Sequence, residues 1–219
     1  MDGKPALVLF HMQKGLAGEQ DFIPNWGGDA VTKIRESGMV DRIQDLLAAF
    51  REKGLPIAFV NAIPNPLGKV PTYGYLYDEI RAANFAKSDL LHDERLRYGL
   101  DVMPEMDRRE DEPILLNWLL GAFTMSGLDT WLKMNDVKTC VFGGFAGHSV
   151  VYTSTVQAGD YWYNVVIPRD ATCVLVPRMT VPDGWTMEEA DQKVEDVVFD
   201  ILAPTYSLVT TSDDVIEHL

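Results

Sequence analysis

The sequence is poor in the residues that mark secreted scaffolds and metal proteins. Only two of its 219 residues are cysteines, Cys140 and Cys173, and they lie far apart within apolar runs. Two cysteines are too few for a small scaffold held together by disulfide bonds, and two buried thiols are typical of a reducing compartment. The spacing of the cysteines and the 4 histidines matches no common metal site, so we expect no metal.

Positive charge and long apolar runs are also scarce. The chain has 19 lysines and arginines against 33 aspartates and glutamates, which leaves a net charge of −14. Such a surface repels phosphate backbones and anionic lipids, so no nucleic-acid or membrane partner is expected. The longest apolar run, Pro113 to Phe123, is too short to span a bilayer, and the N-terminus lacks the features of a signal peptide. We therefore expect a cytoplasmic protein.

Short apolar runs alternate with amphipathic segments along the whole chain. Six continuous apolar runs have the length of buried strands, at residues 6–10, 56–60, 114–116, 139–142, 165–167 and 207–209. Apolar residues at three- and four-residue spacing predict helices at 39–50, 128–134, 149–158 and 188–202. This alternation predicts an α/β fold, a three-layer Rossmann-like sandwich with a six-stranded, mainly parallel sheet and helices on both faces. The length suits one domain over residues 1–219.

Residues 63–112 form the least regular part of the sequence. They are rich in proline, glycine and tyrosine at first and densely charged towards the end. A long connection of this kind in an α/β domain is usually functional, so we interpret it as an irregular lid or an oligomer contact. A plain surface excursion is an alternative that the sequence leaves open. We expect a homo-oligomer, either a dimer or a tetramer.

Polar residues follow the ends of the predicted strands, where ligands bind in open parallel sheets. They are His11 and Gln13 after the first strand, Asn61 after the second, Asn117 after the third, and the glycine-rich segment 143–149 after the fourth. A glycine turn that feeds a helix presents backbone N–H groups to a carboxylate or a developing oxyanion. The turn lacks the glycine order and the lysine of nucleotide-binding loops, so no cofactor is expected.

Four segments together resemble the isochorismatase-like (cysteine hydrolase) superfamily, which includes isochorismatases and nicotinamidases. The segment Ala6-Leu-Val-Leu-Phe-His-Met-Gln13 is similar to the opening strand of that family, which ends in Asp-Met-Gln. The other three are Ile114-Leu-Leu-Asn-Trp-Leu-Leu-Gly-Ala-Phe123, Gly144-Phe-Ala-Gly-His-Ser-Val-Val-Tyr-Thr153 and Ile167-Pro-Arg-Asp-Ala-Thr172. Their order and spacing hold over nearly the whole chain, so the resemblance implies the same fold.

The resemblance also implies where a catalytic triad would lie. The Asp, Lys and Cys of the family fall on His11, Asn117 and Val150, and valine has no nucleophilic atom. Cys140 lies within a strand, and we expect Cys173 to lie away from the strand ends, so neither cysteine is a substitute. The nicotinamidase branch binds a metal through Asp and His residues after the second strand. Here residues 61–66 hold no such ligand.

Three residues remain as candidates for catalysis. His11 suits a general acid or base, because an ordinary histidine pKa of about 6.5 lies near physiological pH. His148 starts a helix, where the dipole favours the neutral imidazole, and Asn117 can orient a substrate oxygen. Each has a structural alternative: a backbone hydrogen bond for His11, a cap for His148 and a loop contact for Asn117. The expected substrate-binding residues are Gln13, Asn61, Trp118, Phe145, Ala146, Gly147, Ser149 and Val150. A Ser149–His11 nucleophilic pair is a further alternative.

Two functional hypotheses follow. The favoured one is an enzyme that acts on a small organic metabolite by non-covalent acid–base chemistry, such as vinyl-ether hydrolysis, elimination, isomerisation or cyclisation. None of these reactions needs a nucleophilic side chain. The alternative is a catalytically silent member that binds a metabolite or a partner subunit. Polar residues at every strand end favour the enzyme.

Overall fold

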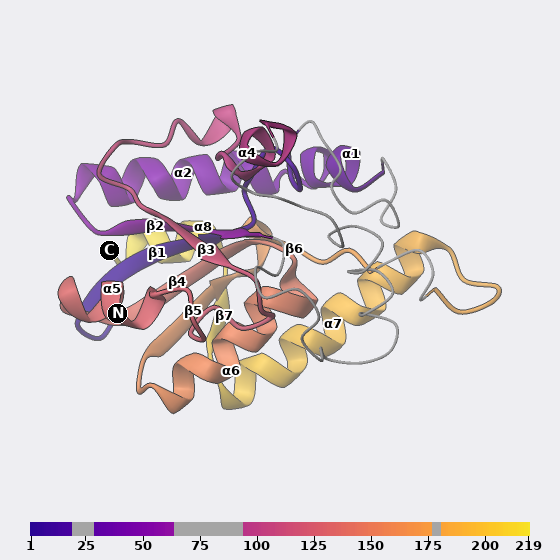
Figure 1. The fold of residues 1–219 in the computed structure, drawn as a ribbon. Helices are drawn as coiled ribbons and strands as arrows, with labels where there is room; N and C mark the ends of the chain where they lie inside the picture. Colours follow the sequence, from indigo (N-terminus) through magenta and orange to yellow (C-terminus); the bar gives the residue numbers. More distant parts are fainter. Residues whose placement is uncertain (19–28, 64–93, 177–180) are drawn as a thin grey trace.

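A single parallel sheet lies between two layers of helices in the computed structural model (Figure 1). The structure describes residues 1–18, 29–63, 94–176 and 181–219. The strands are β1 (Lys4–Phe10), β2 (Ile57–Ala62), β3 (Ile114–Asn117), β4 (Val137–Phe145), β5 (Asn164–Pro168), β6 (Thr172–Cys173) and β7 (Leu208–Thr210). Their order is β3-β2-β1-β4-β5-β7, with β6 paired to β4, and every pair of these strands is parallel.

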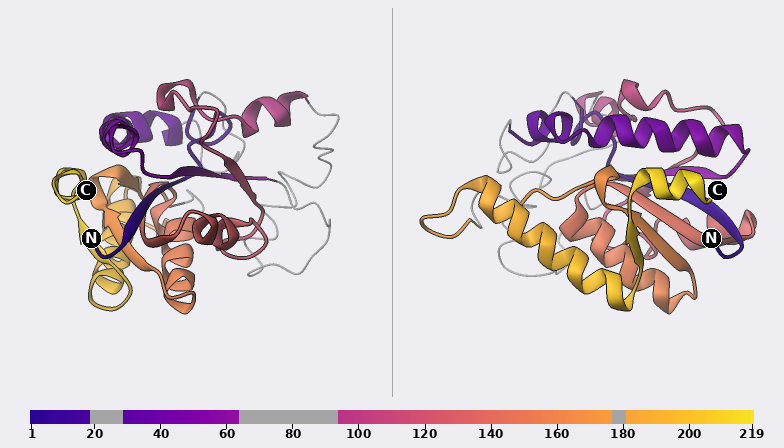
Figure 2. Two further views of the ribbon diagram at one scale, coloured as in Figure 1. Left: turned by 90° about the vertical axis from the view of Figure 1, so that its left-hand side faces the viewer. Right: turned by 180° about the vertical axis from the view of Figure 1, so that it is seen from behind.

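The helices cover both faces of the sheet. In Figure 1, α1, α2 and α4 lie above it and α5, α6 and α7 lie below it, while Figure 2 shows α8 on the same side as α2. The helices are α1 (Asp29–Glu36), α2 (Met39–Glu52), α4 (Glu94–Leu100), α5 (Leu128–Met134), α6 (Tyr152–Asp160), α7 (Met187–Thr205) and α8 (Ser212–Glu217). Three short turns are helical as well, η1 (Pro104–Met106), η2 (Gly147–Val151) and η3 (Arg169–Ala171). No described helix is long and apolar enough to cross a membrane.

The continuous apolar runs are explained by burial on both faces of the sheet. In β1, Leu7 and Leu9 join the core cluster under α2, whereas Val8 and Phe10 join the cluster under α5 and α6. Successive side chains of a strand point to opposite faces, so a strand covered on both sides needs apolar residues at every position. The predicted α/β sandwich with a parallel sheet is therefore confirmed, with β6 as an additional short strand.

Part of the predicted 63–112 insertion belongs to the core. Residues 64–93 lie outside the described residues, but Val102, Met103 and Met106 are buried in the cluster that contains the apolar side of α2. The segment after α4 is thus packed rather than a plain surface excursion. Its role as a lid or an oligomer contact stays a prediction.

Candidate functional site

The carboxyl ends of four neighbouring strands bring the predicted polar residues to one edge of the sheet. Phe10 pairs with Val60 of β2 and with Gly144 of β4, so His11 lies between the ends of these two strands. Asn117 pairs with Ala62 at the end of β3. The sheet order runs outward from β1 and β4 in opposite directions, which makes this edge the switch point where such folds bind ligands.

His11 has an unusual backbone. Its φ is 54°, in the left-handed region that histidine visits only occasionally. Its N–H donates to the carbonyl oxygen of Val60 at 2.8 Å, and its side chain is half-buried. The left-handed turn ends β1 and directs the chain towards Gln13.

The glycine turn after β4 is packed too closely for other residues. Gly144 has a φ of 107°, and a Cβ there would lie 2.3 Å from the carbonyl oxygen of Phe10. A Cβ at Gly147 would lie 2.7 Å from Cγ2 of Val174. The Phe145–Ala146 peptide bond between them is cis. The turn opens η2 and then α6, as the sequence pattern predicts.

His148 is neutral at physiological pH. Burial lowers its pKa to about 4, and the nearby Asp191 carboxylate opposes this shift only in part. The sequence predicts a neutral imidazole from the helix dipole, and in the structure desolvation by burial favours the same neutral form. Its Nδ1 atom is buried and has no hydrogen-bond partner in the described part of the chain.

Asp191 is a residue of this region that the sequence interpretation misses. It lies on α7 with 3% of its surface exposed, forms an ion pair with Lys33 of α1, and accepts a hydrogen bond from the Val176 N–H at 2.7 Å. A signal is present in the sequence, because Asp191 interrupts the apolar side of α7 next to Ala190. Because α7 contains many other acidic residues, the sequence does not distinguish Asp191 from the exposed ones.

The two predicted substrate-binding amides at the ends of β1 and β2 contact α4. Nε2 of Gln13 donates to the carbonyl oxygens of Ala62 and Gly99, both at 3.1 Å. Nδ2 of Asn61 donates to the carbonyl oxygen of Leu100 at 2.7 Å, while its buried Oδ1 has no partner among the described residues.

Asn117 is bonded to the loop that follows β3. Its Nδ2 donates to the carbonyl oxygen of Leu119 at 2.7 Å, and its Oδ1 accepts from the Leu119 N–H at 3.1 Å. These two hydrogen bonds agree with the structural alternative for Asn117, a contact with its own loop. One N–H and one lone pair of the amide remain for other partners.

The remaining predicted binding residues are mostly packed in the core. Val150 is 1% exposed and belongs to the cluster with Phe123, whereas Phe145 and Ala146 belong to the cluster under α2. Gly147 and Trp118 are buried as well, and Ser149 is half-buried within η2. Five of these residues, 145–147, 149 and 150, belong to the glycine turn and the segment that directly follows it, whereas Trp118 follows β3.

Neither cysteine is a thiolate at neutral pH. Burial raises the pKa of Cys140 well above its usual range, and burial raises the pKa of Cys173 to about 12. The expectation that Cys173 lies away from the strand ends is wrong, because it pairs with Phe145 beside the glycine turn. The short strand β6 causes this, and a run of two residues is too brief to detect as a strand.

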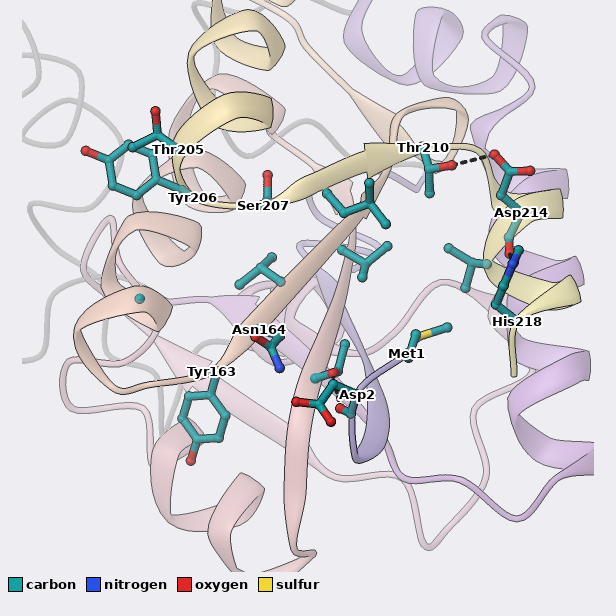
Figure 3. Close-up of a pocket in the computed structure, with 16 residues that line it drawn as sticks. Met1, Asp2, Tyr163, Asn164, Thr205, Tyr206, Ser207, Thr210, Asp214 and His218 are labelled. Atoms are coloured by element: carbon teal, nitrogen blue, oxygen red, sulfur yellow. Dashed lines mark hydrogen bonds between the residues drawn. The ribbon is translucent and has the colours of Figure 1, made fainter.

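A groove lies at the opposite end of the sheet. It has a volume of about 740 Å³ and is lined among others by Thr139, Asn164, Leu208 and Val215, near the amino ends of β4 and β5 (Figure 3). None of the predicted site residues lines it. The described residues also contain no group of three or more His, Cys, Asp or Glu side chains that could hold a metal ion.

Comparison with known proteins identifies the family. The model of the isochorismatase domain matches residues 5–189. The chain belongs to the isochorismatase family. A curated relative is the uncharacterized isochorismatase family protein YrdC of Bacillus subtilis, 22% identical over 173 residues, which are 78% of this chain and 75% of the relative.

Solved structures share the isochorismatase fold along almost the whole chain. A cysteine hydrolase from Pseudomonas syringae pv. phaseolicola superposes with a TM-score of 0.73 at 19% identity, covering 98% of this chain and 91% of the other. An isochorismatase family protein from Burkholderia thailandensis has a TM-score of 0.68 at 23% identity, with coverage of 98% and 94%. The N-carbamoylsarcosine amidase from Thermoplasma acidophilum has a TM-score of 0.62 at 19% identity, with coverage of 96% and 97%. These similarities establish the fold.

Proposed function

We propose that this isochorismatase-family protein is an enzyme that acts on a small organic metabolite by non-covalent general acid–base chemistry. The observation that carries this proposal is the state of its candidate nucleophiles. Val150, at the position that the family resemblance assigns to cysteine, is a core residue with 1% of its surface exposed. Both thiols of the chain are buried and have raised pKa values. Covalent catalysis needs an activated nucleophile, whereas proton transfer does not.

His11 is the proposed acid–base residue. It directly follows β1, between the ends of β2 and β4, and the residue is half-buried although its Nε2 atom is buried. In vinyl-ether hydrolysis, the protonated imidazole would transfer its proton to the vinyl carbon. Water then adds to the resulting oxocarbenium carbon and gives up a proton to the imidazole, and the hemiketal collapses to a carbonyl compound and an alcohol.

His148 and Asn117 would orient the substrate. The neutral imidazole of His148 has a buried Nδ1 without a partner among the described residues, and an unpaired buried polar atom is unfavourable unless a ligand satisfies it. Asn117 retains one donor and one acceptor after bonding to Leu119. Elimination, isomerisation and cyclisation use the same groups for proton transfer and orientation.

The test compares His11→Asn with Val150→Ala on a panel of vinyl ethers and small amides. Asparagine tolerates the left-handed backbone of His11 but does not titrate near neutral pH, so the fold is retained. We expect kcat to fall by about 10²- to 10⁴-fold in His11→Asn, the usual contribution of a general acid or base.

Val150→Ala is the control for the nucleophile position, and we expect its turnover to stay within about three-fold of the parent. Full activity in His11→Asn would contradict the acid–base role. Ligand-induced thermal stabilisation without any product across the panel would instead support the silent binder.

A further inference from the structure

Both donors of the Gln13 amide are used by the protein itself. The side chain is 1% exposed, and its Oε1 accepts from the Ala62 N–H at 2.6 Å while Nε2 donates to the carbonyl oxygens of Ala62 and Gly99. Both amide protons are therefore committed to backbone acceptors. Towards Ala62 the side chain pairs with the N–H and the C=O of one residue, as a neighbouring strand would.

These bonds join three segments that are distant in sequence. Gln13 follows β1, Ala62 ends β2, and Gly99 lies in the last turn of α4, 86 residues after Gln13. The last carbonyl groups of a helix have no partner within the helix. Here donors outside the helix satisfy these carbonyl groups. The Gly15 N–H also donates to the carbonyl oxygen of Gly99 at 3.0 Å, and the side chain of Asn61 donates to the carbonyl oxygen of Leu100.

His11 lies within the same connection. Its N–H bonds to Val60, and two residues later Gln13 bonds to Ala62, so β2 holds the chain on both sides of the left-handed turn. Between them, the carbonyl oxygen of Met12 accepts from the Met103 N–H at 3.0 Å. A non-glycine residue in the left-handed region persists only where its surroundings hold it there.

We propose that Gln13 is a positioning residue that couples the docking of α4 to the placement of His11. The Gln13 amide does not bind substrate; it sets the backbone of the turn that carries the imidazole. This inference rests on the proposed function for its catalytic consequence, but the coupling itself can be measured without a substrate.

The first variant is Gln13→Met, which keeps the length of the side chain and removes its three hydrogen bonds. We expect the NMR signals of the His11 ring to move and the amide protons of Gly15 and Met103 to exchange at least about ten-fold faster, because local opening becomes easier. With an active substrate, kcat should fall at least about ten-fold while KM stays within about three-fold.

A matched control is Gln44→Met. Gln44 lies on α2, and its Nε2 donates to the carbonyl oxygen of Glu105 at 2.7 Å, so it contacts the same segment after α4 but not the His11 turn. We expect the His11 signals to be unchanged in this variant.

The second variant is Gln13→Glu, which tests the two hydrogen bonds donated by Nε2. It also provides a measurement if Gln13→Met does not fold. The carboxylate would face the carbonyl oxygens of Ala62 and Gly99, whereas the protonated acid recovers one donor. Burial and these oxygens raise the carboxyl pKa in the folded state. The variant should therefore be closest to the parent at pH 5 and lose thermal stability relative to it as the pH rises to 8.

The outcomes separate the two proposals. Loss of stability in both variants with unchanged His11 signals would overturn the positioning role. If the difference in thermal stability between Gln13→Glu and the parent did not change between pH 5 and 8, the two hydrogen bonds donated by Nε2 of Gln13 would be wrongly assigned. Shifted His11 signals in Gln13→Met, together with full turnover in His11→Asn, would leave the coupling intact and contradict only the acid–base function.

Discussion

Gly144 shows how single residues set the geometry of the candidate site. Its backbone is left-handed, and its α-carbon faces the carbonyl group of Phe10 on β1. Because the two backbones can approach this closely, Phe10 of β1 stays paired with Gly144 of β4, directly before His11. A side chain at this position would push the two strand ends apart.

Replacement of Gly144 by alanine should therefore be strongly destabilising. The new Cβ would lie 2.3 Å from the Phe10 oxygen and the residue would keep a φ of 107°, so we expect a loss of at least about 2 kcal/mol in the free energy of unfolding. Urea denaturation measures the loss.

The matched control is Gly159→Ala in α6, where a Cβ would meet no atom of the described residues within 4 Å. Alanine should raise stability there by about 0.5–1 kcal/mol, because it loses less backbone entropy in a helix. Equal effects of the two substitutions would show that the close contact at Gly144 is relaxed at little cost.

The roles of individual polar residues were only partly predictable. Residue type and strand-end position identify Gln13, Asn61 and Asn117 as candidates, but they say nothing about hydrogen-bond partners. In the structure, Gln13 and Asn61 bond to α4, and Asn117 bonds to its own loop. The sequence does not distinguish a side-chain amide that binds a ligand from one that forms hydrogen bonds to the backbone.

At the scale of elements, one buried ion pair attaches α2 to the segment before β3. Arg51 near the end of α2 donates from Nε and Nη2 to the two carboxylate oxygens of Glu112, at 2.7 and 2.8 Å. Nη2 also reaches the carbonyl oxygens of Met106 and Asp107. The hydrogen bond to Glu112 is the largest of the effects that raise the pKa of Arg51.

Glu112→Gln should weaken this attachment. Both charged side chains are largely buried, with 11% and 5% of their surfaces exposed, so removal of the carboxylate leaves a buried guanidinium without its counter-charge. We expect a loss of roughly 3 kcal/mol in the free energy of unfolding, measured by denaturant titration.

Asp45→Asn makes the same chemical change in an exposed pair, 3.8 Å from Arg42, and should alter stability by less than about 0.5 kcal/mol. If Glu112→Gln changed stability no more than Asp45→Asn, the pair would contribute as little as a surface contact.

The predicted elements differ from the observed ones mainly where tertiary contacts decide. The helix α2 and its buried side follow from apolar spacing alone. The short helices α1, α4 and α8, of eight, seven and six residues, are not among the predicted helices. The helix predicted at 149–158 begins within η2, which covers Gly147–Val151, and α6 starts only at Tyr152.

At the scale of the whole molecule, buried and paired groups make stability depend on pH. His148 has a folded-state pKa of about 4, below the ordinary value near 6.5, because burial disfavours its charged form. The unfolded chain binds a proton at this residue at higher pH than the folded chain does. The contribution of neutral His148 is thus fully present above pH 6.5 and is lost as the pH falls towards 4.

We therefore expect His148→Asn to flatten the fall in stability between pH 6.5 and 4, by at most about 3 kcal/mol. Thermal unfolding midpoints measured across this range give the profile. Identical slopes for the parent and His148→Asn would contradict the assigned pKa.

The sequence by itself determined the fold class and the polar residues that follow the predicted strands, because these depend on residue type and local spacing. Tertiary structure alone decided that Gln13 bonds to Ala62 and Gly99, 49 and 86 residues away, and that Cys173 lies beside the glycine turn. It also decided that His148 is buried, which keeps its imidazole neutral. The reason is that hydrogen-bond partners and solvent exposure depend on which distant segments meet, and no local pattern in the chain records those contacts.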